Sequence, residues 1–129
     1  MKTKNYILFS ILTSFLILVG SCQANTALIQ ADDLEEMMMI NDNIQLIDVR
    51  TPEEFQEGHL ENATNINWND KDFALQTQDL NKEEPIYLYC KSGRRSAAAA
   101  QQLTKEGFEV YDLKGGIDYW MNNNYPVTK

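Results

Sequence analysis

The ten residues YLYCKSGRRS (residues 87–96) place a cysteine between an apolar segment and a basic loop. The segment at residues 85–89 is rich in aromatic and aliphatic side chains, which indicates a buried strand. The run at residues 96–106 contains four consecutive alanines and stops at Gly107, a composition that favours a helix. The sequence therefore predicts the order strand, Cys90, short loop, helix.

The same alternation of strands and helices extends to both sides of this stretch. The predicted elements are a helix capped by Asp32 and broken at residues 41–43, a strand at 44–47, a helix capped by Thr51 and ending near Gly58, a strand at 63–66, a strand at 108–111 and a last helix at 117–121. Strands joined by helical crossovers form parallel sheets that helices cover. We therefore expect one α/β domain with a small parallel β-sheet and helices on both faces.

The first 21 residues differ in character from the rest of the chain. Lys2 and Lys4 precede an apolar run at residues 6–19, and small residues follow before Cys22. This is the layout of a secretory signal peptide. The run is shorter than the roughly 20 apolar residues that a transmembrane helix needs. We assign residues 1–21 to the signal peptide, 22–27 to a tether and 28–129 to the folded domain.

Three fates of this leader are open. Residues 19–22 (VGSC) resemble a bacterial lipobox, in which Cys22 is lipidated and becomes the first mature residue. Residues 22–24 (CQA) resemble an ordinary cleavage site, and a retained membrane anchor is the third alternative. We favour the lipoprotein, and expect an exported bacterial protein that is periplasmic or anchored to a membrane. In the first two cases Cys22 is acylated or removed, which leaves Cys90 as the only thiol of the mature chain.

The charge of the chain is strongly negative. Lys2 and Lys4 are the only charged residues of the leader, so nine basic and 19 acidic side chains remain after it, a net charge of −10. Such a chain does not attract nucleic acid or anionic lipid through its overall field. We expect a monomer that meets a membrane only through its lipid anchor. The 108 residues from Cys22 onward suffice for one hydrophobic core.

The loop after Cys90 has the features of a site for a reactive thiolate. Backbone amides between a strand and a helix N-terminus can form a nest of donors, which lowers the pKa of a thiol there. Gly93 supplies a residue that adopts a positive φ without cost. Lys91, Arg94 and Arg95 place positive charge around the sulfur of an otherwise acidic domain, and so favour an anionic substrate. The alternative is a solvated loop beside an inert buried thiol.

Three segments in order resemble the rhodanese family of sulfurtransferases. They are LIDVRTPEEFQEGHLENATNIN (residues 46–67), CKSGRRS (residues 90–96) and GFEVYDLKGGIDYW (residues 107–120). The resemblance covers roughly residues 28–120. It implies a single-domain rhodanese fold and a catalytic Cys90 that carries sulfane sulfur as a persulfide. It also implies a substrate-binding loop formed by Lys91, Ser92, Gly93, Arg94 and Arg95.

The length of the loop favours sulfur transfer over a related chemistry. Protein tyrosine phosphatases, rhodanese-like phosphatases and arsenate reductases place five residues between the nucleophilic cysteine and its arginine, whereas Cys90 and Arg95 have four between them. The shorter ring suits a persulfide sulfur better than a tetrahedral oxyanion. We expect transfer of sulfur from an anionic donor such as thiosulfate to cyanide or a thiol. A sulfur-binding or protein-interaction module with little turnover is the main alternative, and a phosphatase or arsenate reductase is a more distant one.

Several other residues can be interpreted either as structural or as functional. Asp48 and Arg50 follow a predicted strand, where they either contact the active loop or tie the strand to the next helix. His59 is the only histidine, and a structural hydrogen bond is favoured over a general-base role. Trp68 and Trp120 are expected to pack in the core. No group of Cys, His and Asp residues has metal-ligand spacing, so neither a metal nor another cofactor is predicted.

Overall fold

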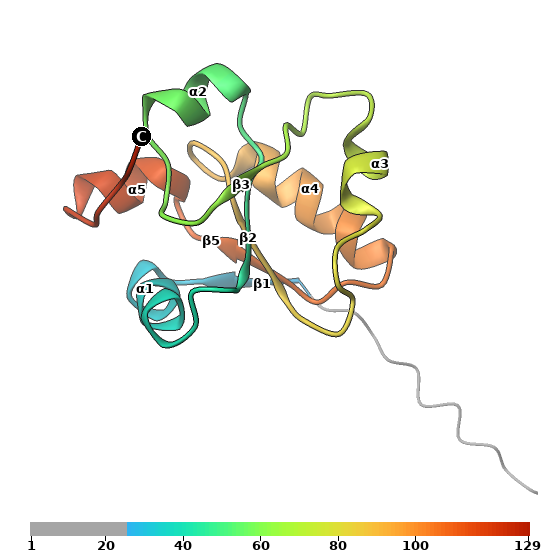
Figure 1. The fold of residues 1–129 in the computed structure, drawn as a ribbon, viewed down its shortest axis with the longest axis horizontal. Coiled ribbons are helices and arrows are strands. Elements are labelled where there is room, and N and C mark those ends of the chain that lie inside the picture. Colours follow the sequence, from blue (N-terminus) through green and yellow to red (C-terminus); the bar gives the residue numbers. More distant parts are fainter. Residues whose placement is uncertain (1–25) are drawn as a thin grey trace, which may run out of the picture.

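The computed structural model describes residues 26–129, and its centre is one five-stranded sheet of order β1-β5-β4-β2-β3 in which all pairs are parallel (Figure 1). The strands are β1 (Thr26–Ile29), β2 (Gln45–Asp48), β3 (Thr64–Asn65), β4 (Ile86–Tyr89) and β5 (Val110–Leu113). The helices are α1 (Ala31–Ile40), α2 (Pro52–Glu57), α3 (Phe73–Thr77), α4 (Arg94–Lys105) and α5 (Gly116–Asn122).

The central strand β4 supplies side chains to two separate hydrophobic cores. Ile86 and Leu88 pack with residues of α3 and α4, whereas Tyr87 and Tyr89 pack with residues of α1 and α5. Successive residues of a strand face opposite sides of a sheet, which explains this division. Figure 1 shows α1 and α5 on one side of the strands and α3 and α4 on the other. The predicted α/β fold, a small parallel sheet with helices on both faces, is confirmed.

The N-terminal end of the domain differs from the prediction in two ways. Thr26 and Ala27 belong to β1 and pair with β5, so they are part of the sheet rather than of the predicted tether. Helix α1 begins at Ala31 with Gln30 as its N-cap, so the predicted cap at Asp32 is wrong. Asp32 lies instead in the first turn, where a negative charge suits the helix dipole.

One helix that was not predicted and the bounds of two other elements also depart from the prediction. Helix α3 has five residues and no side-chain cap, and nothing in the sequence predicts it. Helix α4 begins two residues before the predicted position, because Gly93 with φ 112° is its N-cap. Strand β5 ends at Leu113, two residues beyond its predicted end, and Phe108 lies in the core beside α4 instead of in the strand.

Residues 1–25 lie outside the described residues, and with them the predicted signal peptide, its cleavage alternatives and the lipidation site at Cys22. Over residues 26–129, no helix is both long enough and apolar enough to cross a bilayer.

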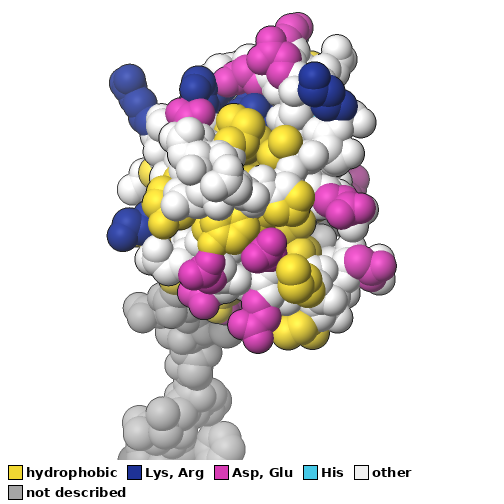
Figure 2. Space-filling model, turned by 90° about the vertical axis from the view of Figure 1, so that its left-hand side faces the viewer, with side chains coloured by type: hydrophobic (Ala, Val, Ile, Leu, Met, Phe, Trp, Pro, Cys, Tyr) yellow, Lys and Arg dark blue, Asp and Glu magenta, His cyan; other side chains and the backbone are white. Residues whose placement is uncertain are grey.

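The face of the molecule formed by α1 and α5 exposes apolar side chains among acidic ones (Figure 2). Met39 and Ile40 at the end of α1 are 77% and 71% exposed. The exposed acidic residues Asp33 and Glu36 lie on the same helix, and neither α1 nor α5 contains a basic residue. These two helices therefore contribute acidic but no basic side chains to this face.

Candidate active site

Cys90 lies at the carboxyl end of the central strand β4, and its loop leads directly into α4. In open α/β sheets ligands bind outside this end of the strands. The loop residues Lys91, Ser92 and Arg94 are exposed, whereas Cys90 itself is only 1% exposed. The thiol therefore lies at the bottom of a loop whose outer side faces solvent.

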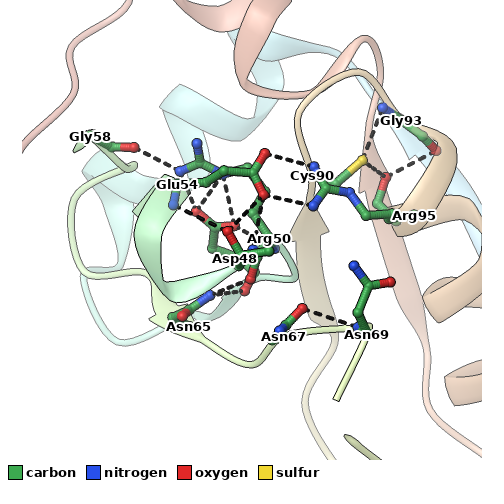
Figure 3. A network of polar contacts seen from close by, with 12 residues as sticks. Asp48, Arg50, Glu54, Gly58, Asn65, Asn67, Asn69, Cys90, Gly93 and Arg95 are labelled. Atoms are coloured by element: carbon green, nitrogen blue, oxygen red, sulfur yellow. Dashed lines mark hydrogen bonds and ion pairs between the residues drawn. The ribbon is translucent and has the colours of Figure 1, made fainter. Parts of the chain in front are cut away.

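The polar neighbours of the sulfur come from its own loop and from the first turn of α4 (Figure 3). The Gly93 amide donates a hydrogen bond to Cys90 Sγ at 3.1 Å. The thiol donates to Ser96 Oγ at 3.4 Å, and this hydroxyl donates to the Gly93 carbonyl at 3.2 Å. Gly93 has φ 112°, which a residue with a side chain rarely adopts, so the expected positive φ is confirmed.

Two opposing effects act on the pKa of the Cys90 thiol. Burial raises this pKa, because it disfavours the charged thiolate. Hydrogen bonds from the Ser96 hydroxyl and from the amides of Ser96, Gly93 and Ser92 lower it. The hydrogen bonds prevail, and the pKa lies below that of an ordinary cysteine. A lowered thiol pKa is what a nest of backbone amides predicts.

Arg95 is held by a carboxylate from a distant part of the sequence. Its two terminal nitrogens donate to Glu54 Oε2 at 2.7 Å and Oε1 at 2.8 Å. This guanidinium is the main reason why the pKa of Glu54 falls to about 2. Glu54 also forms the capping box of α2 with Thr51. One carboxylate therefore fixes the start of α2 and joins it to the first turn of α4 (Figure 3).

Asp48 and Arg50 form a buried ion pair beside this junction. Arg50 Nη2 lies 2.7 Å from Asp48 Oδ2 and also donates to the Gly58 carbonyl at 2.7 Å. The side-chain amide of Asn65 donates through Nδ2 to the backbone carbonyl oxygens of both residues. Within residues 26–129, the side chains of Asp48 and Arg50 form no hydrogen bond to the loop of Cys90. Their contacts are structural ones, because they join β2 to β3 and to the end of α2 and not to the active loop.

The three basic residues of the loop have different surroundings. Lys91 Nζ lies 2.8 Å from Asp118 Oδ1 in an ion pair that is exposed on both sides. Arg95 is bound by Glu54. In the part of the chain that the structure describes, Arg94 forms no ion pair. Arg94 is therefore the loop cation whose charge is least compensated by a neighbour.

The backbone of the loop is fastened to the N-terminus of α5. The amide of Ile117 donates to the Cys90 carbonyl at 2.9 Å, and the amide of Asp118 donates to the Lys91 carbonyl at 3.0 Å. Gly116 makes this approach possible, since a Cβ there would lie 2.6 Å from the Cys90 carbonyl oxygen, and its φ is +60°. A glycine is required at this position on both counts.

The remaining predicted residues have structural roles. His59 stacks on Phe55 with the ring centroids 3.7 Å apart, and its Nδ1 lies 2.9 Å from the Phe55 carbonyl oxygen. Trp120 is fully buried and donates to the Pro126 carbonyl. Trp68 packs edge-on against Phe73. The structural hydrogen bond of His59 and the packing of both tryptophans are confirmed.

Three residues that contribute to the site have no assigned role in the sequence analysis. Glu54 has a recognisable signal only as a helix cap, and its pairing with Arg95 spans 41 positions. Ser96 follows the loop directly, and that position is the signal that it faces the sulfur. Asp112 on β5 carries a polar side chain in a strand, yet it is only 3% exposed. Burial raises its pKa to about 6, and the Ser96 hydroxyl acts in the opposite direction.

No group of three or more His, Cys, Asp or Glu side chains within residues 26–129 is arranged to hold a metal ion.

Comparisons with known proteins show which family and fold the chain resembles. The family model of the rhodanese-like domain matches residues 30–123. The uncharacterized protein YqhL of Bacillus subtilis is 36% identical over 119 residues, which is 91% of this chain and 93% of YqhL. The thiosulfate sulfurtransferase GlpE of Vibrio cholerae is 31% identical over 93 residues, 71% of this chain and 86% of GlpE. A rhodanese-related protein from Thermoplasma volcanium has a crystal structure that matches with a TM-score of 0.69 at 32% identity and covers 78% of this chain and 95% of its own.

Proposed function

The chain belongs to the rhodanese-like domain family, and from this we propose that it transfers sulfane sulfur from an anionic donor such as thiosulfate to cyanide or a thiol, through a persulfide on Cys90. One observation carries the proposal. The Cys90 sulfur lies inside a short loop and accepts the Gly93 amide at 3.1 Å, where hydrogen bonds lower the pKa of the thiol. The similarity to a relative named thiosulfate sulfurtransferase supports the choice of donor.

The reaction proceeds by two displacements at sulfur. The Cys90 thiolate attacks the outer sulfur of thiosulfate, a new S–S bond forms, and sulfite leaves with the electron pair of the bond that breaks. Cys90 then carries a persulfide anion. Cyanide attacks the terminal sulfur, the S–S bond breaks, thiocyanate leaves and the thiolate returns. Covalent double displacement of this kind gives ping-pong kinetics.

The surrounding groups have distinct parts in this scheme. The amides that face Cys90 stabilise negative charge on the sulfur, because such donors act strongly in a site that excludes water. Arg94 attracts the donor into the loop against the negative charge of the domain. Arg95 is bound by Glu54, so we assign it mainly a structural role, which is to maintain the shape of the loop. Ser92 and Gly93 supply backbone donors.

The mass of the intact protein tests the persulfide. After thiosulfate treatment and desalting we expect a gain of one sulfur atom in the wild type, which cyanide removes, and no gain in Cys90→Ser. Serine is nearly isosteric with cysteine but a far weaker nucleophile at neutral pH, so thiosulfate:cyanide transfer should also disappear. An unchanged melting temperature is the control for folding. A Cys90→Ser protein with wild-type transfer would refute the mechanism.

The burial of Cys90 is compatible with the alternative function, a sulfur-binding or protein-interaction module with little turnover. A cysteine residue that is only 1% exposed suits a domain that binds sulfur and passes it slowly to a protein partner. This alternative predicts the gain of one sulfur atom without rapid transfer to cyanide. A protein that takes up no sulfur but hydrolyses aryl phosphates or reduces arsenate would instead belong to the phosphatase or arsenate reductase group.

We also propose that the protein is exported and that Cys22 carries lipid, on the sequence of its leader alone. Detergent partitioning and mass spectrometry of material from the native host test this. A water-soluble mature chain that begins after Ala24 would indicate ordinary signal cleavage.

A further inference from the structure

Ser96 contacts the reacting sulfur but has no step of its own in the two displacements of the proposed mechanism. It is fully buried in the first turn of α4. The Cys90 thiol donates a hydrogen bond to Ser96 Oγ at 3.4 Å, and the Ser96 hydroxyl donates to the Gly93 carbonyl at 3.2 Å. The hydroxyl therefore touches the atom that is the nucleophile of the first displacement and the leaving group of the second.

The Gly93 carbonyl does not depend on this hydroxyl for its hydrogen bonding. It also accepts the backbone amide of Ala97 at 3.0 Å. The hydroxyl hydrogen of Ser96 can therefore rotate from Gly93 to a sulfur that has lost its proton, and the buried carbonyl still has a partner. A hydroxyl group both accepts and donates, so Ser96 matches a thiol as acceptor and a thiolate as donor.

The burial of Ser96 determines on which side of the sulfur it acts. Ser96 is fully buried, whereas Lys91, Ser92 and Arg94 of the loop are exposed. A sulfur donor arrives from solvent, so the outer sulfur of the persulfide is added on the exposed side of Cys90. Ser96 therefore contacts the inner sulfur, Cys90 Sγ, from the opposite side.

The inner sulfur needs a hydrogen-bond donor when the S–S bond of the persulfide breaks, because its negative charge returns at that moment. Cys90 is almost fully buried, so water stabilises little of this charge. The Gly93 amide supplies one hydrogen bond at 3.1 Å (Figure 3). Burial raises the pKa of the thiol, and the Ser96 hydroxyl is the largest of the hydrogen-bond effects that lower it.

We propose that Ser96 is a catalytic residue of the second displacement, in which its hydroxyl turns from the Gly93 carbonyl to Cys90 Sγ and stabilises this sulfur as the leaving group. The inference deepens the proposed function and rests on it. When cyanide attacks, its electron pair forms the new C–S bond, and the pair of the S–S bond stays on Sγ. The Ser96 hydroxyl keeps its proton and donates only a hydrogen bond. The products are thiocyanate and the thiolate.

The two displacements should respond in opposite directions when this hydrogen bond is removed. A stabilised thiolate is a better leaving group but a weaker nucleophile. With the thiol ionised, Ser96→Ala should slow discharge by cyanide about threefold and speed up attack on thiosulfate about threefold, since exchange rates follow thiol pKa with a sensitivity of about one half. The ratio of the two rates then shifts about tenfold, which corresponds to a thiol pKa higher by about one unit.

Rapid quenching followed by intact-mass measurement gives the rate of each displacement separately. Thiosulfate should add one sulfur atom to the wild type and to Ser96→Ala, and cyanide should remove it from the loaded proteins. The pH dependence of iodoacetamide alkylation gives the thiol pKa of each protein and the pH at which both are ionised. The matched control is Thr77→Val, which removes another fully buried helical hydroxyl, one that donates to the Phe73 carbonyl at 3.1 Å. It should keep both wild-type rates.

Slower discharge with undiminished attack on thiosulfate and a raised thiol pKa would support the inference. Equal slowing of both displacements would indicate a distorted loop and overturn it, and so would wild-type rates in Ser96→Ala. Alanine is a strong helix former, so the variant should fold, and its melting temperature verifies this. A wild type that gains no sulfur would refute the proposed function itself, whereas sulfur gain and loss at equal rates in both proteins would refute only the role of Ser96.

Discussion

Glu54 and Asp112 are two acidic residues near the first turn of α4, and their pKa values are displaced in opposite directions. Glu54 comes from α2 and binds Arg95, whereas Asp112 comes from β5 and lies near Ser96. Burial raises the pKa of both carboxyl groups. Only for Glu54 does a guanidinium outweigh that effect, so its pKa is about 2, while the pKa of Asp112 is about 6. The partner across the contact decides which of two acidic residues stays charged.

The two carboxyl groups lie on two sides of the active site. We call the side of Glu54 and Arg95 fixed, because its charges should not change near neutral pH, and the side of Asp112 adjustable, because its charge should. Where Arg95 and Glu54 meet, the pKa of Glu54 is about 2, so we expect the ion pair to persist near neutral pH. The pKa of Asp112 is raised to about 6, so we expect its charge to change near neutral pH. The loop of Cys90 lies between these two sides. Neutral replacements of the two carboxylates are the direct way to test this division.

The largest expected effect is on the adjustable side, in the pH dependence of stability. The folded-state pKa of Asp112, about 6, lies above its ordinary value of 3.8, so the folded protein binds this proton more tightly than the unfolded chain. The wild type therefore loses stability as the pH rises from about 4 to about 6. Asp112→Asn has no such loss, and it should gain up to about 3 kcal/mol in free energy of unfolding relative to the wild type between pH 4 and pH 8.

Urea unfolding of both proteins at pH 4 and pH 8 measures this difference. Parallel pH dependences in the two proteins would show that Asp112 has an ordinary pKa, and would remove the contrast with Glu54.

Glu54→Gln should have the opposite sign and a smaller size. The folded-state pKa of Glu54 is about 2, below its ordinary value of 4.5, so its contribution to stability is present above about pH 4.5 and is lost as the pH falls towards 2. We expect a loss of about 2 kcal/mol at pH 7, since the side chain is 27% exposed and solvent screens part of the interaction. Glu53→Gln, an exposed neighbour, is the control in urea unfolding. A loss that persists at pH 2 would point to packing instead of charge.

The smallest expected effect extends the comparison to the loop cations. Arg94→Gln should raise the KM for thiosulfate about fivefold, roughly 1 kcal/mol, with little change in kcat, because its charge acts on donor capture. Lys91→Gln should raise KM about twofold at most, since Asp118 already compensates Lys91. Steady-state kinetics at two salt concentrations measure both, and kcat/KM of the wild type should fall with added salt. Equal KM values in both variants and the wild type would show that the loop charges are merely solvated.

Most of the fold follows from local patterns in the sequence. The apolar run before Cys90 and the alanine-rich run after it predict β4 and α4 because burial and helix propensity act over many residues there. Strand β1 has four residues, of which three are exposed at the sheet edge, so it shows no pattern of burial. Helix α3 has five residues and no cap. Elements this short are determined by their tertiary contacts and leave little local signal.

For the site too, local features could be predicted from the sequence and contacts between distant segments could not. Cys90 and Gly93 could be predicted, because their roles depend on residues within the loop itself. The pairing of Arg95 with Glu54 could not, since it joins two helices that are 41 positions apart. The burial of Asp112 could not either, because the predicted strand ends at residue 111 and an acidic residue after a strand is usually assigned to a solvent-exposed turn. The fold alone places it beneath α4.

The contact between Gly116 and the loop determines which way the peptide groups of that loop point. In a trans peptide, the carbonyl and the following N–H are oriented in opposite directions. The Cys90 and Lys91 carbonyls are held by the amides of Ile117 and Asp118, so the N–H groups of Lys91 and Ser92 are turned away from α5. The Ser92 amide accordingly faces the Cys90 sulfur. A glycine outside the loop thus helps to set the direction in which the amides beside Cys90 point.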